Sequence, residues 1–118
     1  MGDNIALEKS YAFSLRVVNL FLHLREQKIE RTLIVQLLRS ATSIGANIEE
    51  AIGGQSKKDF ISKIGIAYKE AREAHYWLRL LKDVGIIEIK LADSFLQDAE
   101  ELKKILASIL KTSKTKAV

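Results

Sequence analysis

Residues 39–63 read RSATSIGANIEEAIGGQSKKDFISK, and this stretch decides the fold. In its first half, apolar residues recur every three or four positions, which is typical of an amphipathic helix. Gly53 and Gly54 end that helix, because glycine is favoured just past a helix C-terminus. Ser56 then caps another helix, and Asp59 three residues later completes a capping box. The stretch therefore predicts two consecutive helices joined by a tight turn.

The same periodicity continues outward from this turn and predicts four helices, near residues 4–25, 30–52, 56–84 and 90–111. Gly85 is expected to follow the end of the third helix. The connection 26–29 contains neither glycine nor proline. A turn is still expected there, because one helix over both segments would be roughly 75 Å long. The sequence predicts an all-α, antiparallel up-down four-helix bundle over residues 1–112, followed by a short, basic, frayed C-terminal tail, 113–118.

Apolar residues spaced alternately by three and four predict the core of this bundle. They are Ile34, Leu37, Ala41, Ile44, Ile48 and Ala51 in the second helix, Phe60, Ile64, Ala67, Ala71, Ala74, Leu78 and Leu81 in the third, and Ala92, Phe95, Ala99, Leu102, Leu106 and Ile109 in the fourth. Among these, six are named as buried core positions: Leu37, Ile44, Phe60, Leu78, Phe95 and Leu102. The outer side of the second helix carries small residues, Ser40, Ser43 and Asn47, which fit either close packing between subunits or a neutral surface.

The first helix carries two apolar strips, whereas one strip is enough for an ordinary bundle helix. The first consists of Tyr11, Leu15, Val18 and Leu22, and the second of Phe13, Val17, Leu20 and Leu24. Together they cover roughly 220° of the helix circumference. The surplus indicates either deep burial or a subunit interface. We favour the interface, assign it to Phe13, Val17, Leu20 and Leu24, and expect a homo-oligomer.

Composition excludes several classes of protein. Hydrophobic residues make up 47% of the chain and charged residues 29%, which is typical of a folded protein rather than a disordered one. There is no cysteine, so disulfides and thiolate chemistry are excluded and a cytoplasmic location is expected. No segment resembles a secretion signal or a membrane span.

No pattern of an active site or cofactor site is present. Di-iron bundles need two Glu-x-x-His motifs. The chain has two histidines, His23 and His75, and the residues three positions before them are Leu20 and Arg72 instead of glutamate. The adjacent carboxylates of the 49–50 pair diverge by about 100° on a helix and cannot share a substrate. We therefore predict that the protein is not an enzyme and that it binds no metal and no cofactor.

The third helix carries a cationic stripe opposite its apolar face. The entire net charge of +4 lies in residues 57–118, because acidic and basic residues balance in residues 1–56. Cations with interleaved tyrosines suit a phosphate backbone and unpaired bases, although the same pattern also fits a solvated outer face. The predicted nucleic-acid-binding residues are Lys58, Lys69, Arg72, Tyr76, Arg79 and Lys82. The lysines at 111, 114 and 116 are expected to contribute less, because a frayed tail must be ordered to bind.

Four segments carry a resemblance to a known family: KSYAFSLRVV at 9–18, the stretch 39–63, AYKEAREAHYWLRLLKDVGII at 67–87 and DAEELKKILASILKTSK at 98–114. The chain resembles the four-helix-bundle proteins encoded in intervening sequences of bacterial 23S rRNA genes, a family that includes accessory proteins of diversity-generating retroelements. It differs at 45–47, where many members have a proline. The resemblance implies an up-down bundle, often a homopentamer. For the retroelement branch it implies binding of RNA and a reverse transcriptase, and a ribosomal component is the other partner that it suggests. It implies no catalytic residues.

The sequence thus predicts a non-catalytic, oligomeric, nucleic-acid-binding adapter that presents a basic helical surface to structured RNA or an RNA–protein complex. The alternative is a homo-oligomeric scaffold that binds a protein partner without nucleic acid. Neither alternative involves a membrane.

Overall fold

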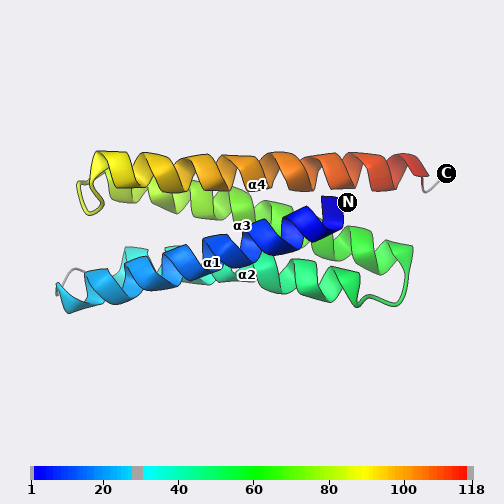
Figure 1. Cartoon of the computed structure of the whole chain (residues 1–118), viewed down its shortest axis with the longest axis horizontal. Helices are drawn as coiled ribbons and strands as arrows, with labels where there is room; N and C mark the ends of the chain where they lie inside the picture. The colour runs from blue at the N-terminus through cyan, green and yellow to red at the C-terminus, as the bar shows by residue number, and fades with distance from the viewer. Residues whose placement is uncertain (1, 28–30, 117–118) are drawn as a thin grey trace.

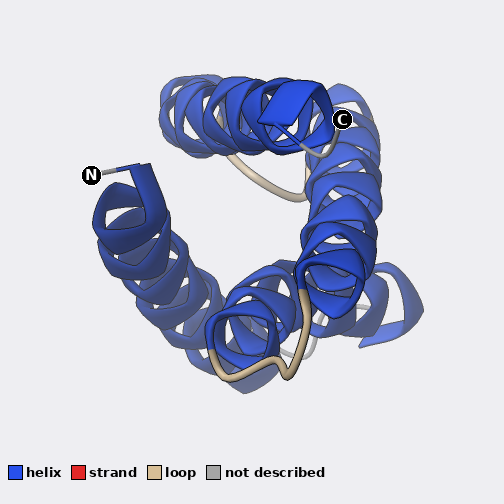
Figure 2. Ribbon diagram, turned by 90° about the vertical axis from the view of Figure 1, so that its right-hand side faces the viewer, coloured by secondary structure: helices blue, strands red, loops and turns tan. Residues whose placement is uncertain are grey.

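The computed structural model describes residues 2–27 and 31–116 and shows four helices in up-down order: α1 (Gly2–Glu26), α2 (Arg31–Ile52), α3 (Lys57–Asp83) and α4 (Ile89–Lys116) (Figure 1). The bundle is elongated, with extents of 50 × 21 × 20 Å. Each helix packs against its two neighbours in the cycle α1–α2–α3–α4, and Figure 2 shows this cyclic order end-on. Within the described residues, the diagonal pairs α1/α3 and α2/α4 do not pack against each other. The predicted all-α four-helix bundle is confirmed.

Local signals place the turns on either side of α3. Ser56 has an extended backbone, and its side-chain oxygen accepts a hydrogen bond from the Asp59 N–H, as a helix N-cap does. Gly85 has a φ of 81°, a conformation that favours glycine, and the Ile86 N–H donates to the Leu81 carbonyl across it. Both predicted boundaries are confirmed. The expected break between the first two helices is also present, although the predicted start at residue 30 lies outside the described residues.

The core follows the predicted seams closely. Every predicted seam residue of α2 is buried. The other buried seam residues are Ile64, Ala67, Ala71, Ala74, Leu78 and Leu81 in α3, and Ala92, Phe95, Ala99, Leu102 and Leu106 in α4. Phe60 and Ile109 are the exceptions, because both pack only at the margin of the core and stay partly exposed. The prediction that Phe60 is buried was therefore wrong. It lies in the first turn of α3, where the bundle ends and fewer neighbours cover a side chain.

The two apolar strips of α1 face the reverse of what was predicted: the strip assigned to the interface faces the core, and the other faces outward. Phe13, Val17, Leu20 and Leu24 are all buried in the core of the same chain, so they cannot form a surface for a second subunit. The strip that faces outward consists of Tyr11, Leu15, Val18 and Leu22, and we call it the α1 strip. Three of its members are exposed, and Val18 is half-buried. The assignment of the interface to the other strip was wrong.

Close contact between α1 and α2 explains this orientation. Ser10 of α1 is buried. A Cβ atom placed on Gly45 of α2 would lie 3.5 Å from the hydroxyl oxygen of Ser10. Ser14 also donates a hydrogen bond to the carbonyl of Ala41 in α2. Small residues on both helices let the backbones approach, which turns the face of α1 that contains Ser10 toward the core.

Helix α4 is longer than expected, because it continues to Lys116 instead of ending near Lys111. Most of the tail predicted to be frayed is therefore helical. No glycine or proline interrupts residues 112–116, and the Thr115 hydroxyl donates to the carbonyl of Lys111 one turn earlier. None of the described helices combines the length and the apolar character needed to cross a membrane.

Candidate nucleic-acid interface

The outward side of α3 brings together most of the predicted nucleic-acid-binding residues. Ala67, Ala71 and Leu78 are completely buried, so the opposite side of the helix faces solvent. The side chains on that side are exposed. We call its four cations the basic face: Lys58, Lys69, Arg72 and Arg79.

Two tyrosine–arginine pairs lie along this side. The Arg72 guanidinium lies 5.9 Å from the ring centroid of Tyr68, and its Nη1 donates a hydrogen bond of 3.4 Å to the tyrosine hydroxyl. The Arg79 guanidinium lies 5.7 Å from the ring centroid of Tyr76. Such cation–π contacts hold guanidinium groups beside aromatic rings. Tyr68 was not among the predicted binding residues, although its spacing of four from Arg72 is the signal that could have identified it.

Lys82 is set apart from the other predicted residues. Its Nζ lies 2.6 Å from a carboxylate oxygen of Asp93 in α4. This hydrogen bond raises the pKa of Lys82, so the lysine stays charged, but the partner carboxylate cancels its charge locally. Lys82 therefore ties α3 to α4 rather than extending the basic face.

The four cations of the basic face have no ion-pair partner among the residues that the structure describes, a property that they share with other exposed cations such as Lys57 and Lys104. By contrast, Lys63 pairs with Glu50 at 2.9 Å and Lys103 pairs with Glu100 at 3.1 Å. His75 adds no charge nearby, because partial burial lowers its pKa and the charges of Lys103 and Arg79 lower it further. None of the four charges of the basic face is thus compensated by an ion pair within the described chain.

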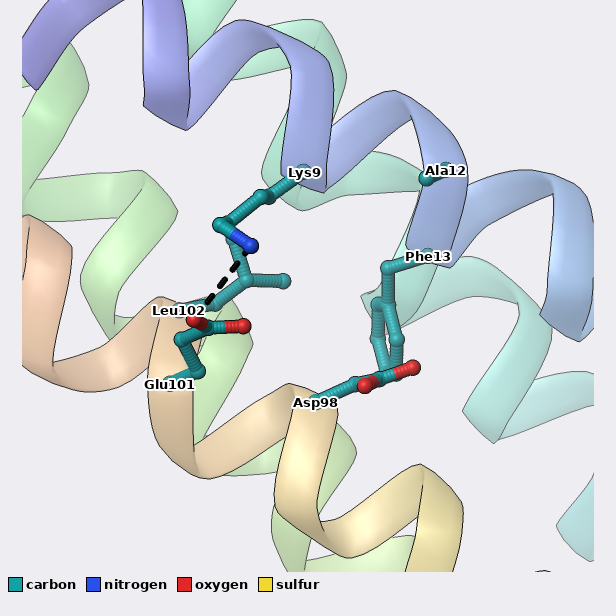
Figure 3. A pocket seen from close by; sticks show the side chains of 6 residues that line it. All are labelled: Lys9, Ala12, Phe13, Asp98, Glu101 and Leu102. Carbon is teal, nitrogen blue, oxygen red and sulfur yellow. Dashed lines mark ion pairs between the residues drawn. The ribbon is translucent and has the colours of Figure 1, made fainter.

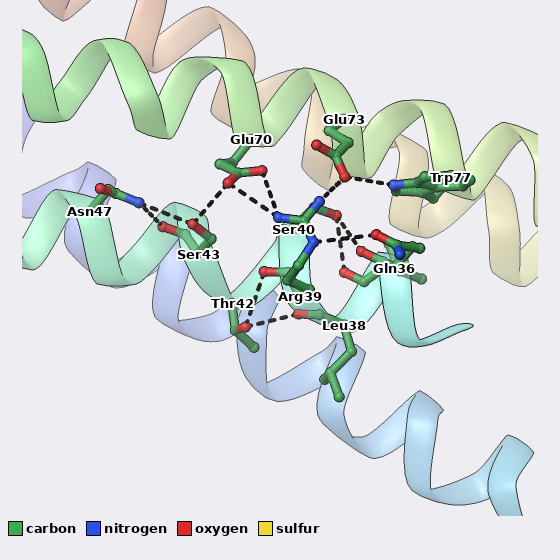
Figure 4. A network of polar contacts seen from close by, with 11 residues as sticks. Gln36, Leu38, Arg39, Ser40, Thr42, Ser43, Asn47, Glu70, Glu73 and Trp77 are labelled. Carbon is green, nitrogen blue, oxygen red and sulfur yellow. Dashed lines mark hydrogen bonds and ion pairs between the residues drawn. The ribbon is translucent and has the colours of Figure 1, made fainter. Parts of the chain in front are cut away.

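Glu70 and Glu73 of α3 point to the other side, toward α2 (Figure 4). Asp83, four residues after Arg79, is exposed on the outward side and interrupts it at the end of the helix. Arg39 of α2 forms ion pairs with both Glu70 and Glu73, and the Trp77 indole donates to Glu73 at 2.9 Å. The Ser43 hydroxyl donates to Glu70 at 3.2 Å. This network neutralises the carboxylates of Glu70 and Glu73 and keeps these two away from the basic face.

The network also corrects the prediction for the small residues of α2. Ser40 is completely buried and donates to backbone carbonyls of its own helix, so it is not on the outer side. Ser43 contacts α3 through Glu70, and the Asn47 amide donates to the Ser43 carbonyl at 2.8 Å. These residues pack α2 against α3 within the chain and are not placed for contact with another subunit.

A small cavity of about 110 Å³ lies between α1 and α4 (Figure 3). An ion pair of 3.3 Å between Lys9 and Glu101 crosses it, and Asp98 at its edge pairs with Arg16. Its two carboxylates are thus already paired with cations of the same chain. Over the described part of the chain, no group of three or more histidine and acidic side chains could hold a metal ion.

Comparisons with known proteins agree with this architecture. Residues 2–108 match the protein family described as 23S rRNA-intervening sequence protein. A crystal structure of a protein of unknown function from Bacteroides thetaiotaomicron, assigned to the S23 ribosomal protein family, is similar to the chain with 46% sequence identity and a TM-score of 0.91. The similarity covers 94% of this chain and 99% of that one. No curated protein matches the sequence.

Proposed function

The chain belongs to the 23S rRNA-intervening sequence protein family, and we propose that this member is a non-catalytic adapter whose basic face binds structured RNA or an RNA–protein complex. The observation that carries the proposal is that four exposed cations without ion-pair partners among the described residues share one side of α3 with two tyrosine–arginine pairs. Cations that already have carboxylate partners must give them up to bind a phosphate, whereas these need not.

The spacing of the basic face suits a phosphate backbone. Lys58 and Arg79 are 21 positions apart, which is about 32 Å of helix at the usual rise. Tyr68 and Tyr76 lie between the cations and offer rings on which unpaired bases can stack. Side chains that could read base edges at fixed geometry are few here. We therefore expect RNA binding with strong dependence on charge and little dependence on sequence.

A salt titration tests this proposal. If the four cations neutralise four phosphates, counterion release should give a slope of about −3 in a plot of log binding constant against log salt concentration. The measurement is fluorescence anisotropy of a labelled, structured RNA between about 50 and 300 mM salt. Absence of binding at about 50 mM salt would contradict the proposal and favour the scaffold.

We also propose that the protein assembles into a homo-oligomer through the α1 strip. Tyr11 is 64% exposed, Leu15 50% and Leu22 39%, and they form a continuous apolar surface on one helix. Such surfaces are uncommon on monomeric proteins unless something covers them. A second copy of the chain is the occupant that we propose. Five subunits is the number that the family resemblance favours. In a ring the basic face would be repeated, so weak contacts with one RNA would reinforce each other.

The Leu15→Glu variant tests the assembly. Light scattering of the wild type at micromolar concentration should give a multiple of 13.3 kDa. The variant should give the mass of one chain, because a buried carboxylate without a partner strongly opposes association. Leu91→Glu is the matched control: Leu91 is also exposed but lies in the first turn of α4, where negative charge is favourable. A wild-type mass of one chain would rule the assembly out.

The same surface supports the second candidate function, a homo-oligomeric scaffold for a protein partner. The family resemblance suggests a reverse transcriptase or a ribosomal component as that partner. The two functions differ in the role of the basic face, because only the adapter requires it. The salt titration therefore separates them.

A further inference from the structure

A groove lies between α3 and α4, beside the basic face. Its volume is about 600 Å³, within the usual range for small-ligand sites. Most of its wall comes from three turns of α3, and the last turns of α4 supply the rest. The residues that matter for the argument are Gly65, Ile66, Tyr68, Lys69, Arg72 and Lys114.

The charge of the groove is entirely positive. Lys69 and Arg72 line it from α3 and Lys114 lines it from α4, and no carboxylate is among the lining residues. Lys114 reaches this place because α4 remains helical beyond Lys111, contrary to the prediction from sequence. Three cations without a nearby acid favour an anionic ligand.

The shape of the groove favours a flat ligand. Gly65 contributes no side chain, and no neighbouring atom lies within 4 Å of the position that a Cβ would take, so the wall is open there. Ile66 adds an exposed apolar surface on one side. On the other side lie the half-buried ring of Tyr68 and the Arg72 guanidinium, which is hydrogen-bonded to the tyrosine hydroxyl. A ring and a planar guanidinium are the groups on which nucleobases stack.

We propose that this groove binds one unpaired nucleotide of RNA. The base lies against Gly65, Ile66 and Tyr68, and the flanking phosphates contact Lys69, Arg72 and Lys114. The inference rests on the proposed function, because the groove shares two cations with the basic face. That continuity favours RNA over an acidic peptide: a strand leaving the groove meets the second tyrosine–arginine pair about 12 Å farther along α3.

The test compares two RNA probes, a fully paired duplex and the same duplex with a single-nucleotide bulge. The wild type should bind the bulged RNA about tenfold more tightly, as expected for one stacked base. Gly65→Leu should remove this preference, because its side chain would fill the groove. The variant should still fold, since leucine is a better helix former than glycine and the space is empty. Ala46→Leu, on the exposed side of α2, is the control and should keep the preference.

Two lysines one turn apart provide a second, independent comparison. Lys114→Ala should lower the affinity for the bulged RNA by several fold, whereas Lys111→Ala should not, because only Lys114 lines the groove. Both lysines are exposed residues of α4, so their replacement perturbs the fold equally little.

The outcomes separate this inference from the proposed function. If the wild type binds both RNAs equally, or if Gly65→Leu keeps the preference, the groove is not a nucleotide site, while the adapter function stands. If the wild type binds neither RNA, both proposals fail. If an acidic helical peptide binds instead, and Gly65→Leu abolishes that binding, the groove is a protein site and the inference is overturned.

Discussion

Replacing Arg72 and Arg79 together by glutamate should weaken RNA binding by about a hundredfold or more. Hydrogen bonds to charged groups contribute about 1.5–3 kcal/mol each, so the loss of two phosphate contacts alone gives this factor. The new carboxylates add repulsion. The effect should shrink as salt is raised, because screening weakens both the attraction that is lost and the repulsion that is gained.

This double change should leave the fold intact. Both arginines are exposed and neither forms an ion pair with a described residue. The change removes two cation–π contacts, each contributing roughly 0.5–1 kcal/mol at an exposed site. Circular dichroism should therefore show wild-type helicity, and light scattering an unchanged mass.

The matched control for this experiment is Arg31→Glu with Lys90→Glu. It changes the net charge by the same amount but lies away from the basic face, in the first turns of α2 and α4, where acidic residues are favourable. If the control loses as much affinity as the α3 variant, binding depends on total charge alone. In that case the basic face has no special role.

Leu78→Ala should lower the free energy of unfolding by about 2–5 kcal/mol, the usual cost of removing a leucine side chain from a filled core. Leu78 is completely buried at the centre of the apolar side of α3. Its neighbours along that side, Ala71 and Ala74, are too small to move into the space that it would leave. The cost should therefore lie toward the upper part of the range.

Urea unfolding followed by circular dichroism measures this cost. Leu91→Ala provides the comparison, because an exposed leucine removed at a surface position should change stability by less than about 0.5 kcal/mol. A cost below about 1 kcal/mol for Leu78→Ala would mean that the core is not packed around this residue as described.

Local patterns in the sequence were sufficient to predict the number of helices and most of their limits. The cap at Ser56 and the glycine at position 85 act within a few residues of themselves, so no knowledge of the rest of the fold is needed. The seams of α2 and α4 were predictable for a related reason. Each of these helices has one dominant apolar strip, and a single strip can only face the core.

The orientation of α1 could not be predicted in this way, because periodicity shows that two strips exist but not which one faces inward. A weaker signal was present toward the N-terminus. If the helical spacing of each strip is extended toward the N-terminus, the buried strip continues to Ser10 and Ala6, whereas the exposed strip continues to Glu8 and Asn4. A charged residue is costly to bury, so this continuation indicates the correct face.

The candidate site was predictable only in part. The common orientation of Lys58, Lys69, Arg72 and Arg79 follows from helix periodicity, and the structure places them together. The ion pair between Lys82 and Asp93 depends on how α4 is rotated against α3, which no local pattern determines. The groove at Gly65 depends on the same contact and on the length of α4.

The diagonal arrangement of α1 and α3 has a geometric consequence for any assembly. Because these two helices occupy opposite corners of the bundle, the α1 strip and the basic face point in opposite directions. In a cyclic oligomer joined through the α1 strips, α1 of every subunit would lie near the central axis and α3 on the outer circumference. An RNA bound to this assembly would run along the outer circumference from one subunit to the next. The length of the RNA would determine how many subunits it contacts.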